Sequence, residues 1–224
     1  MKAQALVFDQ PLSYDDGVAL QERLVDARVA DEIPDTVIFL EHQPVVTLGS
    51  RGNTEHLLMA PDKIRASGVH VAQSSRGGDI TYHAPGQLVM YPILQLADLE
   101  ASAHGYLARL EDIAIRTAAD FGVEAGRREG MTGAWTAHGK ICAIGIRLKR
   151  WVTMHGLAFN IDVDLGGFDS IVPCGLVGES VTSLRALAGE ACPSLEEVRT
   201  HMAAHFEVVC EREITDWQSG EAFI

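Results

Sequence analysis

The pattern of apolar and polar residues along this 224-residue chain predicts strands and helices that follow one another at short intervals. Apolar runs of strand length predict strands at residues 3–8, 36–40, 45–48, 69–71, 132–135, 139–148 and 152–161. Apolar residues spaced three and four apart, or cap residues, predict helices at residues 13–30, 61–65, 104–121 and 194–205. We expect residues 206–210 to form a last strand.

The order of these elements favours an α+β fold. Strands joined by short turns, with only a few long helices, are typical of a mixed or mostly antiparallel sheet. No linker, repeat or low-complexity tract interrupts the chain, so we expect a single domain over residues 1–224. Apolar residues make up 47% of the chain, which is enough for a sizeable core.

The charge balance argues against two classes of partner. The formal net charge is −13, whereas nucleic acids and anionic membranes attract positively charged proteins. Local basic clusters nevertheless occur at Arg127-Arg128 and at Lys149-Arg150, with Arg147 beside the second. They are either solvated loop charges or a docking surface for an acidic partner.

The four cysteines, at positions 142, 174, 192 and 210, form no CxxC pair. Neither a zinc site nor a redox motif is therefore indicated. The sequence has no metal-ligand spacing of the HExxH type and no glycine motif for a phosphate or a dinucleotide. No signal peptide or membrane-spanning run is recognisable, so we expect a cytoplasmic protein with free thiols.

One stretch combines glycines with several reactive side chains. It runs from Ser74 to Gln87 and leads into the apolar residues 88–93, which predict a buried strand. Gly77 and Gly78 permit close approach of a ligand to the backbone, and Arg76, Asp79, Tyr82 and His83 supply polar groups. The stretch is interpreted as a substrate-binding loop; the alternative is a purely structural loop.

Lys140 and Cys174 are the candidate catalytic residues. In a regular strand Lys140 shares a face with Cys142, Ile144, Ile146 and Leu148, so its ammonium group would be poorly hydrated. The alternative is a lysine that reaches solvent from the strand end. Cys174 lies in a loop between Pro173 and Gly175 and needs a nearby ammonium or imidazole to become a good nucleophile.

Other interpretations of these residue types stay open. A lone loop cysteine such as Cys174 can also be structural, and Cys142 and Cys210 look like small buried apolar residues. His83 and His155 stand beside glycine or small residues and could orient or activate a thiol, although structural histidines are equally expected.

Several blocks together give the chain a resemblance to a known family. They are Arg76 to Gln87 followed by Tyr91-Pro92, Glu41-His42-Gln43-Pro44 with Thr47-Leu48-Gly49, Gly139-Lys140-Ile141 with Ala143-Ile144-Gly145, His155 to Asn160, Pro173-Cys174-Gly175 and Val181-Thr182-Ser183-Leu184. In order and spacing these blocks resemble the lipoyl(octanoyl) transferases over about residues 35 to 190. The chain departs from that pattern at Ala84, where the family usually has glycine.

The resemblance implies a fold, a reaction and a set of site residues. The fold would be a curved mixed sheet flanked by helices, similar to the catalytic domain of biotin and lipoate protein ligases. The reaction would transfer an octanoyl group from acyl carrier protein to a lysine of a lipoyl domain, in 2-oxoacid dehydrogenase complexes or in the glycine cleavage H protein. Cys174 would carry the acyl group as a thioester, and Lys140 would favour the thiolate and shuttle protons.

The same resemblance implies the substrate contacts and the partners. The substrate-binding positions would be Arg76, Gly77, Gly78, Asp79, Ile80, Thr81, Tyr82, His83, Ala143, Ile144, Gly145, Gly156, Leu157 and Ala158. Neither ATP nor a metal would be needed. Because acyl carrier proteins are acidic, we expect Arg127, Arg128, Lys149 and Arg150 to include part of a positive docking patch. The alternatives are an ATP-dependent lipoate or biotin ligase, a non-catalytic relative that binds an acyl group or a lipoyl domain, and a cysteine hydrolase.

Overall fold

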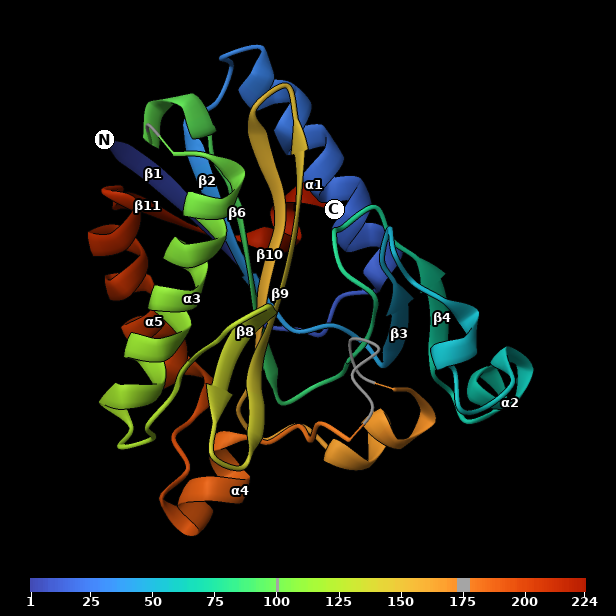
Figure 1. Cartoon of the computed structure of the whole chain (residues 1–224). Coiled ribbons are helices and arrows are strands. Elements are labelled where there is room, and N and C mark those ends of the chain that lie inside the picture. Colours follow the sequence, from blue (N-terminus) through green and yellow to red (C-terminus); the bar gives the residue numbers. More distant parts are fainter. Residues whose placement is uncertain (100, 173–177) are drawn as a thin grey trace.

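The computed structural model, which describes residues 1–99, 101–172 and 178–224, shows a large mixed sheet flanked by helices (Figure 1). Its eight strands lie in the order β11-β1-β2-β6-β10-β9-β8-β7. They are β1 (Lys2–Val7), β2 (Asp35–Leu40), β6 (Gln87–Ile93), β7 (Gly126–Arg128), β8 (Met131–Thr136), β9 (Gly139–Lys149), β10 (Val152–Asn160) and β11 (Glu213–Ser219). β1 runs parallel to β2 and β11, and the other pairs are antiparallel.

A second, three-stranded sheet lies beside the large one. It contains β3 (Val45–Leu48), β4 (His70–Gln73) and β5 (Ile80–His83) in the order β4-β3-β5. The short helix α2 (Pro61–Ala66) precedes β4 and begins with a proline, a residue well suited to the first helical turn. The loop between β4 and β5 carries the glycines singled out above, and the backbone N–H of Gly77 donates to the carbonyl oxygen of Ile146 on β9 at 2.8 Å.

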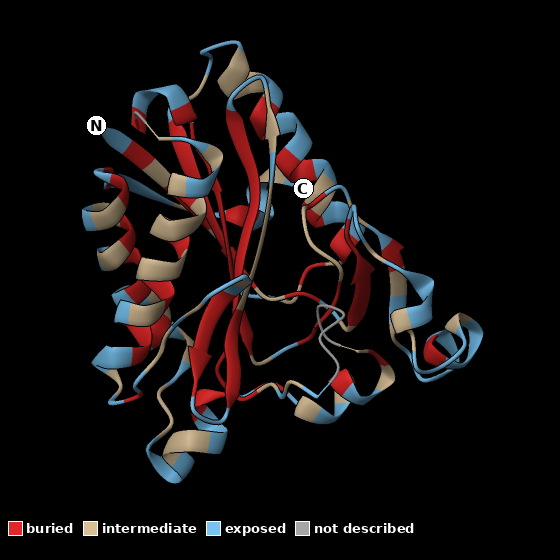
Figure 2. Cartoon of the chain, in the orientation of Figure 1, coloured by how far each residue is buried: buried red, intermediate tan, exposed pale blue. Residues whose placement is uncertain are grey.

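Helices cover both faces of the large sheet (Figure 1). α3 (Ala103–Asp120) and α5 (Leu195–Cys210) pack together on one face, whereas α1 (Tyr14–Val29) covers the other. The short α4 (Leu184–Ala188) precedes α5. Successive residues of β2 enter opposite cores: Phe39 packs toward α3 and α5, and Ile38 packs toward α1. Figure 2 shows the resulting buried strands between partly exposed helices.

The prediction of a strand at residues 206–210 is wrong. α5 continues to Cys210, and the last strand is β11. Val198, Met202, Phe206 and Cys210 recur every four residues and are all fully buried, so this apolar run completes a helical face. A run of five apolar-rich residues does not distinguish a strand from a buried helical turn, and the packing against α3 decides the outcome.

No helix in the described ranges has the length and apolar character that crossing a membrane requires.

A buried ion-pair cluster ties the C-terminal segment to the sheet. One carboxylate oxygen of Asp35, at the start of β2, accepts from Nε of Arg212 at 2.6 Å. The other accepts from Nε of Arg28 on α1 at 2.8 Å and from the backbone N–H of Gln95 at 3.1 Å. The side chains of Asp35 and Arg212 are only 4% and 2% exposed, so neither charge can be satisfied by water.

We therefore expect Asp35→Ala to destabilise the protein strongly, because it leaves two arginines without their shared partner. Removing one partner of a buried pair costs about 3–5 kcal/mol. Urea unfolding at pH 7 measures the loss. Asp62→Ala is the matched control, since its ion pair with Arg65 is exposed and is expected to contribute less than about 1 kcal/mol. Similar small losses for both variants would contradict the assigned role of Asp35.

Candidate functional site

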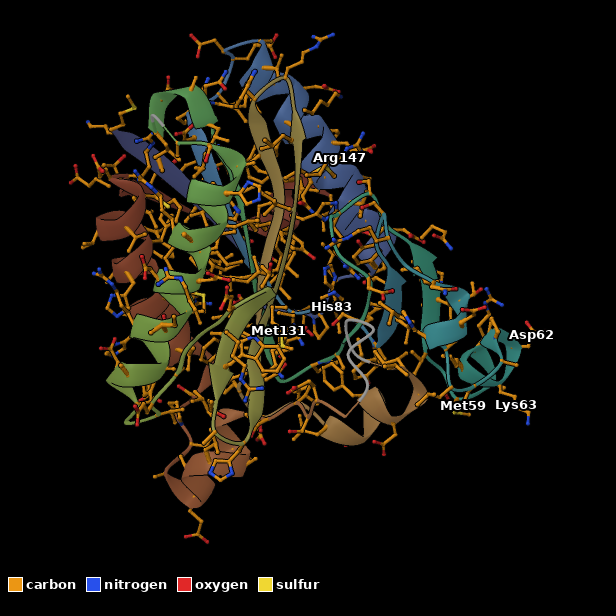
Figure 3. All side chains as sticks on the ribbon, in the orientation of Figure 1. Met59, Asp62, Lys63, His83, Met131 and Arg147 are labelled. Carbon is orange, nitrogen blue, oxygen red and sulfur yellow. The ribbon has the colours of Figure 1, made fainter. Side chains whose placement is uncertain are left out.

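The loop between β4 and β5, residues 74–79, is called the glycine loop. A pocket of about 440 Å³ opens where this loop meets the middle of the large sheet. β5, β9 and β10 supply most of its walls, with α3 and the turn between β7 and β8 at one side. Figure 3 labels His83 and Met131, which reach this space from β5 and β8. The lining residues are Arg51, Arg76 to Thr81, His83, Tyr91, Leu107, Gly130 to Thr132, Lys140, Ala143 to Ile146 and His155 to Ala158.

Nearly all the substrate-binding positions suggested by the sequence lie in this pocket. Arg76 to Thr81, His83, Ala143 to Gly145 and Gly156 to Ala158 line it together with Lys140. Tyr82 does not line it. Because side chains alternate along β5, the ring of Tyr82 points into a separate core, where it lies 5.3 Å from the ring of Phe168.

Because Gly145 and Gly49 have no side chains, the glycine loop can lie against β9 and against the end of β3. A Cβ atom on Gly145 would lie 2.7 Å from the carbonyl oxygen of Gly77, and one on Gly49 would lie 2.5 Å from that of Gly78. Gly78 also has a φ of +92°, which side chains disfavour. The loop backbone thus forms a wall of the pocket, held close to both sheets.

Arg76 and Asp79 fix the conformation of this loop. The guanidinium of Arg76 is largely buried and donates to the carbonyl and hydroxyl oxygens of Thr47 at 2.8 Å. One oxygen of Asp79 accepts from the backbone N–H groups of Ile80 and Asn53, and the other lies 2.5 Å from Nδ1 of His56. These contacts connect the loop to β3 and to the segment after it.

Lys140 is buried at the start of β9, with 6% of its surface exposed. Its Nζ lies 4.7 Å from the ring centroid of Trp135, a favourable position for a cation. The backbone of Lys140 donates to the carbonyl oxygen of Ser180 at 2.9 Å and accepts from the N–H of Thr182 at 3.0 Å. The lysine is therefore held between β8 on one side and the segment 180–182 on the other.

The expectation that Lys140 and Cys142 share one strand face is wrong. Trp135 pairs with Lys140, but the preceding Ala134 pairs with Cys142, so β9 has one extra residue at this point. Ile141 and Cys142 both enter the core because of this irregularity, and Lys140 lines the pocket with Ala143.

Cys174 lies outside the described residues, as does the rest of the segment 173–177. The described chain on either side is anchored at the site. Val172 donates from its backbone N–H to the carbonyl oxygen of His56 at 2.8 Å, and Ser180 accepts from the backbone of Lys140.

The three described cysteines are poor nucleophiles. Burial raises the pKa of the Cys142 thiol, and burial raises that of Cys210 to about 12. Burial also raises the pKa of Cys192, although Arg185 opposes the shift. These thiols stay protonated at neutral pH, and Cys142 and Cys210 are inaccessible.

Three buried histidines form a neutral cluster at the pocket: His83 and His155 line it, and His42 lies next to His83. Burial lowers the pKa of His83 to about 3, with His42 and Arg76 adding to the shift, and it lowers the pKa of His42 to about 4. Burial and the charges of Arg76 and Arg147 lower the pKa of His155 to about 3. All three imidazoles are therefore uncharged at neutral pH.

Hydrogen bonds fix the orientation of these rings. Nδ1 of His83 donates to the side-chain oxygen of Gln87 at 2.7 Å, an assignment made from the hydrogen-bond network, so its Nε2 carries a lone pair. His42 donates from Nδ1 to Leu12 and accepts at Nε2 from the hydroxyl of Tyr91. His155 has a φ of +60° within β10, and its backbone N–H donates to Gln21. Such a backbone conformation is costly for a non-glycine residue, and His155 is the pocket-lining residue of the described chain that adopts it without being a glycine.

Two parts of the pocket were not anticipated from the sequence. The sequence predicts only a helix around Leu107 and a strand that begins at Thr132, and it gives no role to Gly130 or Met131. The half-buried positions of Leu107 and Met131 give no signal in a hydrophobic pattern, because the pattern does not show which side of a helix or turn borders a cavity.

Among the residues that the structure describes, no group of three or more histidine, cysteine or carboxylate side chains is arranged to hold a metal ion.

The neutral histidines predict a loss of stability on mild acidification. In the unfolded chain they bind protons near pH 6.5, but in the folded protein only near pH 3–4. The contribution of the three histidines to the unfolding free energy is therefore fully present above pH 7. It is lost progressively as the pH drops through 6.5. The slope of the unfolding free energy approaches at most about 4 kcal/mol per pH unit near pH 5. Urea unfolding at pH 7.5, 6.5 and 5.5 measures it.

His83→Gln is the control variant for this slope. It removes one of the three titrating rings, so we expect the slope to fall by roughly a third, whatever the change in stability at pH 7.5. A flat profile in the wild type, or an unchanged slope in the variant, would contradict the assignment of neutral buried histidines.

Comparison with known proteins relates the chain to lipoyl protein ligases and octanoyltransferases. A sequence model of the lipoyl protein ligase A/B catalytic domain matches residues 13–207. The octanoyltransferase of Syntrophotalea carbinolica is 46% identical over 196 residues, which cover 88% of this chain and 89% of that protein.

Solved structures with low sequence identity share the fold. Lipoate-protein ligase A, in a crystal structure with bound ATP, superposes with a TM-score of 0.76 at 15% identity and covers 100% of this chain and 92% of the ligase chain. The biotin protein ligase of Aquifex aeolicus superposes with a TM-score of 0.55 at 12% identity, covering 94% of this chain and 70% of that one. These likenesses confirm the predicted α+β fold. Together with the match over residues 13–207, they show that the chain belongs to the lipoyl protein ligase A/B catalytic-domain family.

Proposed function

We propose that this protein is an octanoyltransferase. It takes an octanoyl group from acyl carrier protein, holds it as a thioester on Cys174, and passes it to a lysine of a lipoyl domain. Similar proteins named octanoyltransferase support the activity. The observation that carries the proposal is the burial of Lys140 in a partly apolar pocket beside the glycine loop, with its backbone bonded to Ser180.

Lys140 and Cys174 are proposed to act as a catalytic pair. Ser180, bonded to the backbone of Lys140, is six positions after Cys174, and six extended residues span at most about 20 Å. The separation along the chain therefore permits the two side chains to meet. An ammonium group beside the sulfur favours the thiolate, the form that attacks carbonyl carbon.

In the first step the Cys174 thiolate attacks the thioester carbonyl of the donor. The new carbon–sulfur bond forms as the donor's carbon–sulfur bond breaks, and the departing thiolate takes a proton from the Lys140 ammonium. In the second step the acceptor amine attacks the Cys174 thioester, and Lys140 takes up the proton that this amine loses. An amide forms, and Cys174 leaves as the thiolate that began the cycle.

The apolar lining suits the acyl chain. Leu107, Met131, Ile144 and Ile146 border the pocket with the backbone of glycines between them. Each buried methylene contributes roughly 0.8 kcal/mol, so an eight-carbon chain gains several kcal/mol before the costs of binding. Short acyl groups would lose most of this gain.

The proposal needs neither a nucleotide nor a metal. Exchange between two thioesters is near balance, and conversion of a thioester into an amide runs downhill. The main competing function is that of an ATP-dependent ligase, because lipoate-protein ligase A shares the fold and was solved with ATP bound. A non-catalytic binding protein and a cysteine hydrolase are two further candidates.

The partners follow from the proposed reaction. The donor is octanoyl-acyl carrier protein, and the acceptor is a lipoyl domain of a 2-oxoacid dehydrogenase complex or the glycine cleavage H protein. We propose the cytoplasm as the compartment of the reaction, since a free catalytic thiol is kept reduced there.

We expect an octanoyl adduct on the wild-type protein after incubation with octanoyl-acyl carrier protein in the absence of ATP. Intact-protein mass spectrometry measures it. Cys174→Ser should show no thioester adduct, and Lys140→Ala should acquire the adduct at least about 100-fold more slowly, a typical loss when a proton-transferring group is removed.

The same samples separate the four candidate functions. Turnover that appears only with free octanoate and ATP would replace the transferase with a ligase, and steady release of octanoate without an acceptor would indicate a hydrolase. Binding of octanoyl carrier without any adduct or turnover would indicate a non-catalytic protein. Cys192→Ser serves as the control because Cys192 does not line the pocket, and it should retain the adduct.

A further inference from the structure

Two exposed arginines flank the glycine loop at the rim of the pocket. The backbone N–H of Arg51 donates to the carbonyl oxygen of Gly78 at 3.0 Å, which attaches Arg51 to one side of the loop. On the other side Gly77 donates to Ile146, the residue directly before Arg147. Arg51 itself lines the pocket, and Figure 3 shows Arg147 farther along β9, away from Met131.

Of Arg127, Arg128, Lys149 and Arg150, which were expected to include part of a docking patch, the first three form ion pairs with carboxylates. Arg127 pairs with Glu111 and Asp112. Arg128 pairs with Glu179 at 2.7 Å, and Lys149 pairs with Asp26 at 2.5 Å. Their positive charges are therefore locally balanced and offer little attraction to an acidic partner.

Arg51 and Arg147 differ from these residues. Both side chains are exposed, and neither forms an ion pair with any residue in the described ranges. The carboxylate nearest in the loop, Asp79, already lies against His56 and accepts two backbone N–H groups. The rim thus carries two uncompensated positive charges on a protein whose net charge is −13.

We propose that Arg51 and Arg147 form the docking site for the acidic surface of the carrier protein that delivers the acyl group. This inference rests on the proposed function. An acidic donor is repelled by the overall charge of the enzyme, so productive encounter requires a local positive potential at the entrance. The two arginines supply it on both sides of the loop that leads to Lys140.

The geometry assigns Arg147 a docking role and not a catalytic one. Arg147 follows Lys140 by seven positions on β9, which corresponds to about 23 Å along the strand. A guanidinium at Arg147 therefore cannot contact the carbonyl that reacts beside Lys140. It meets the donor outside the pocket, where the carrier protein itself must lie.

The test compares three thioester donors on the charge-reversal variants Arg51→Glu/Arg147→Glu and Arg147→Glu. The donors are octanoyl-acyl carrier protein, octanoyl-phosphopantetheine and octanoyl-N-acetylcysteamine, and the measured quantity is the rate constant of adduct formation divided by the donor concentration. For the carrier protein we expect a loss of roughly tenfold to a hundredfold at low salt, with a weaker dependence on salt than in the wild type. Because Arg51 lines the pocket, the small donors are compared on Arg147→Glu alone, and they should react within about twofold of the wild-type rate.

Lys63→Glu/Arg116→Glu is the matched control. It makes the same change in net charge at exposed positions outside the pocket, and Lys63 lies on α2 at the far edge of the molecule (Figure 3). It should slow the carrier reaction by less than about threefold, since distant exposed charges are screened.

Each of the following results would contradict the assignment of Arg51 and Arg147 as the docking site. An unchanged carrier rate would remove it, and so would an equal loss in the control variant. An equal loss with octanoyl-phosphopantetheine would assign the arginines to the phosphate of the donor arm. An equal loss with all three donors would indicate damage to the pocket. If the wild type forms no adduct with any donor, the proposed function fails first, which distinguishes the two failures.

Discussion

The site depends on a close approach of two backbones. The glycine loop lies against β9 through the hydrogen bond from Gly77 to Ile146, and this contact is possible only because Gly145 has no side chain. The small sheet carries the loop and the large sheet carries Lys140, so this approach forms the pocket. A methyl group at Gly145 would lie 2.7 Å from the oxygen of Gly77 and would separate the two walls.

Charge within the pocket is confined to few positions. Lys140 and Arg76 are buried cations, whereas His42, His83 and His155 are uncharged because burial lowers their pKa values to between about 3 and 4. Two unit charges 4 Å apart repel by about 4 kcal/mol at an effective dielectric constant of 20. The neutral imidazoles of His83 and His155 can therefore bond polar groups in the pocket without adding to the positive charge of Arg76.

Sequence reasoning reached the α+β fold and most of the pocket, because glycines and reactive residues in fixed order carry a strong signal. It failed where the outcome depends on packing. The run 206–210 became the end of α5 because Phe206 and Cys210 complete a buried helical face. The extra residue of β9 near Ile141 places Lys140 in the pocket and Cys142 in the core. Arg127 and Lys149 form ion pairs with carboxylates that the sequence does not indicate. A local pattern of apolar and polar residues does not indicate any of these long-range contacts.

The fold alone does not determine the source of energy for acyl transfer. Lipoate-protein ligase A, solved with ATP, shares the architecture at 15% identity, so the chemistry must depend on the residues of the pocket. Asp79 is a carboxylate in that lining, but its oxygens are engaged by two backbone N–H groups and by His56, which leaves it poorly placed to bind the Mg²⁺ of a nucleotide. In the proposed reaction the substrate arrives already activated as a thioester, so the buried Lys140 would serve as the proton carrier and Cys174 as the nucleophile.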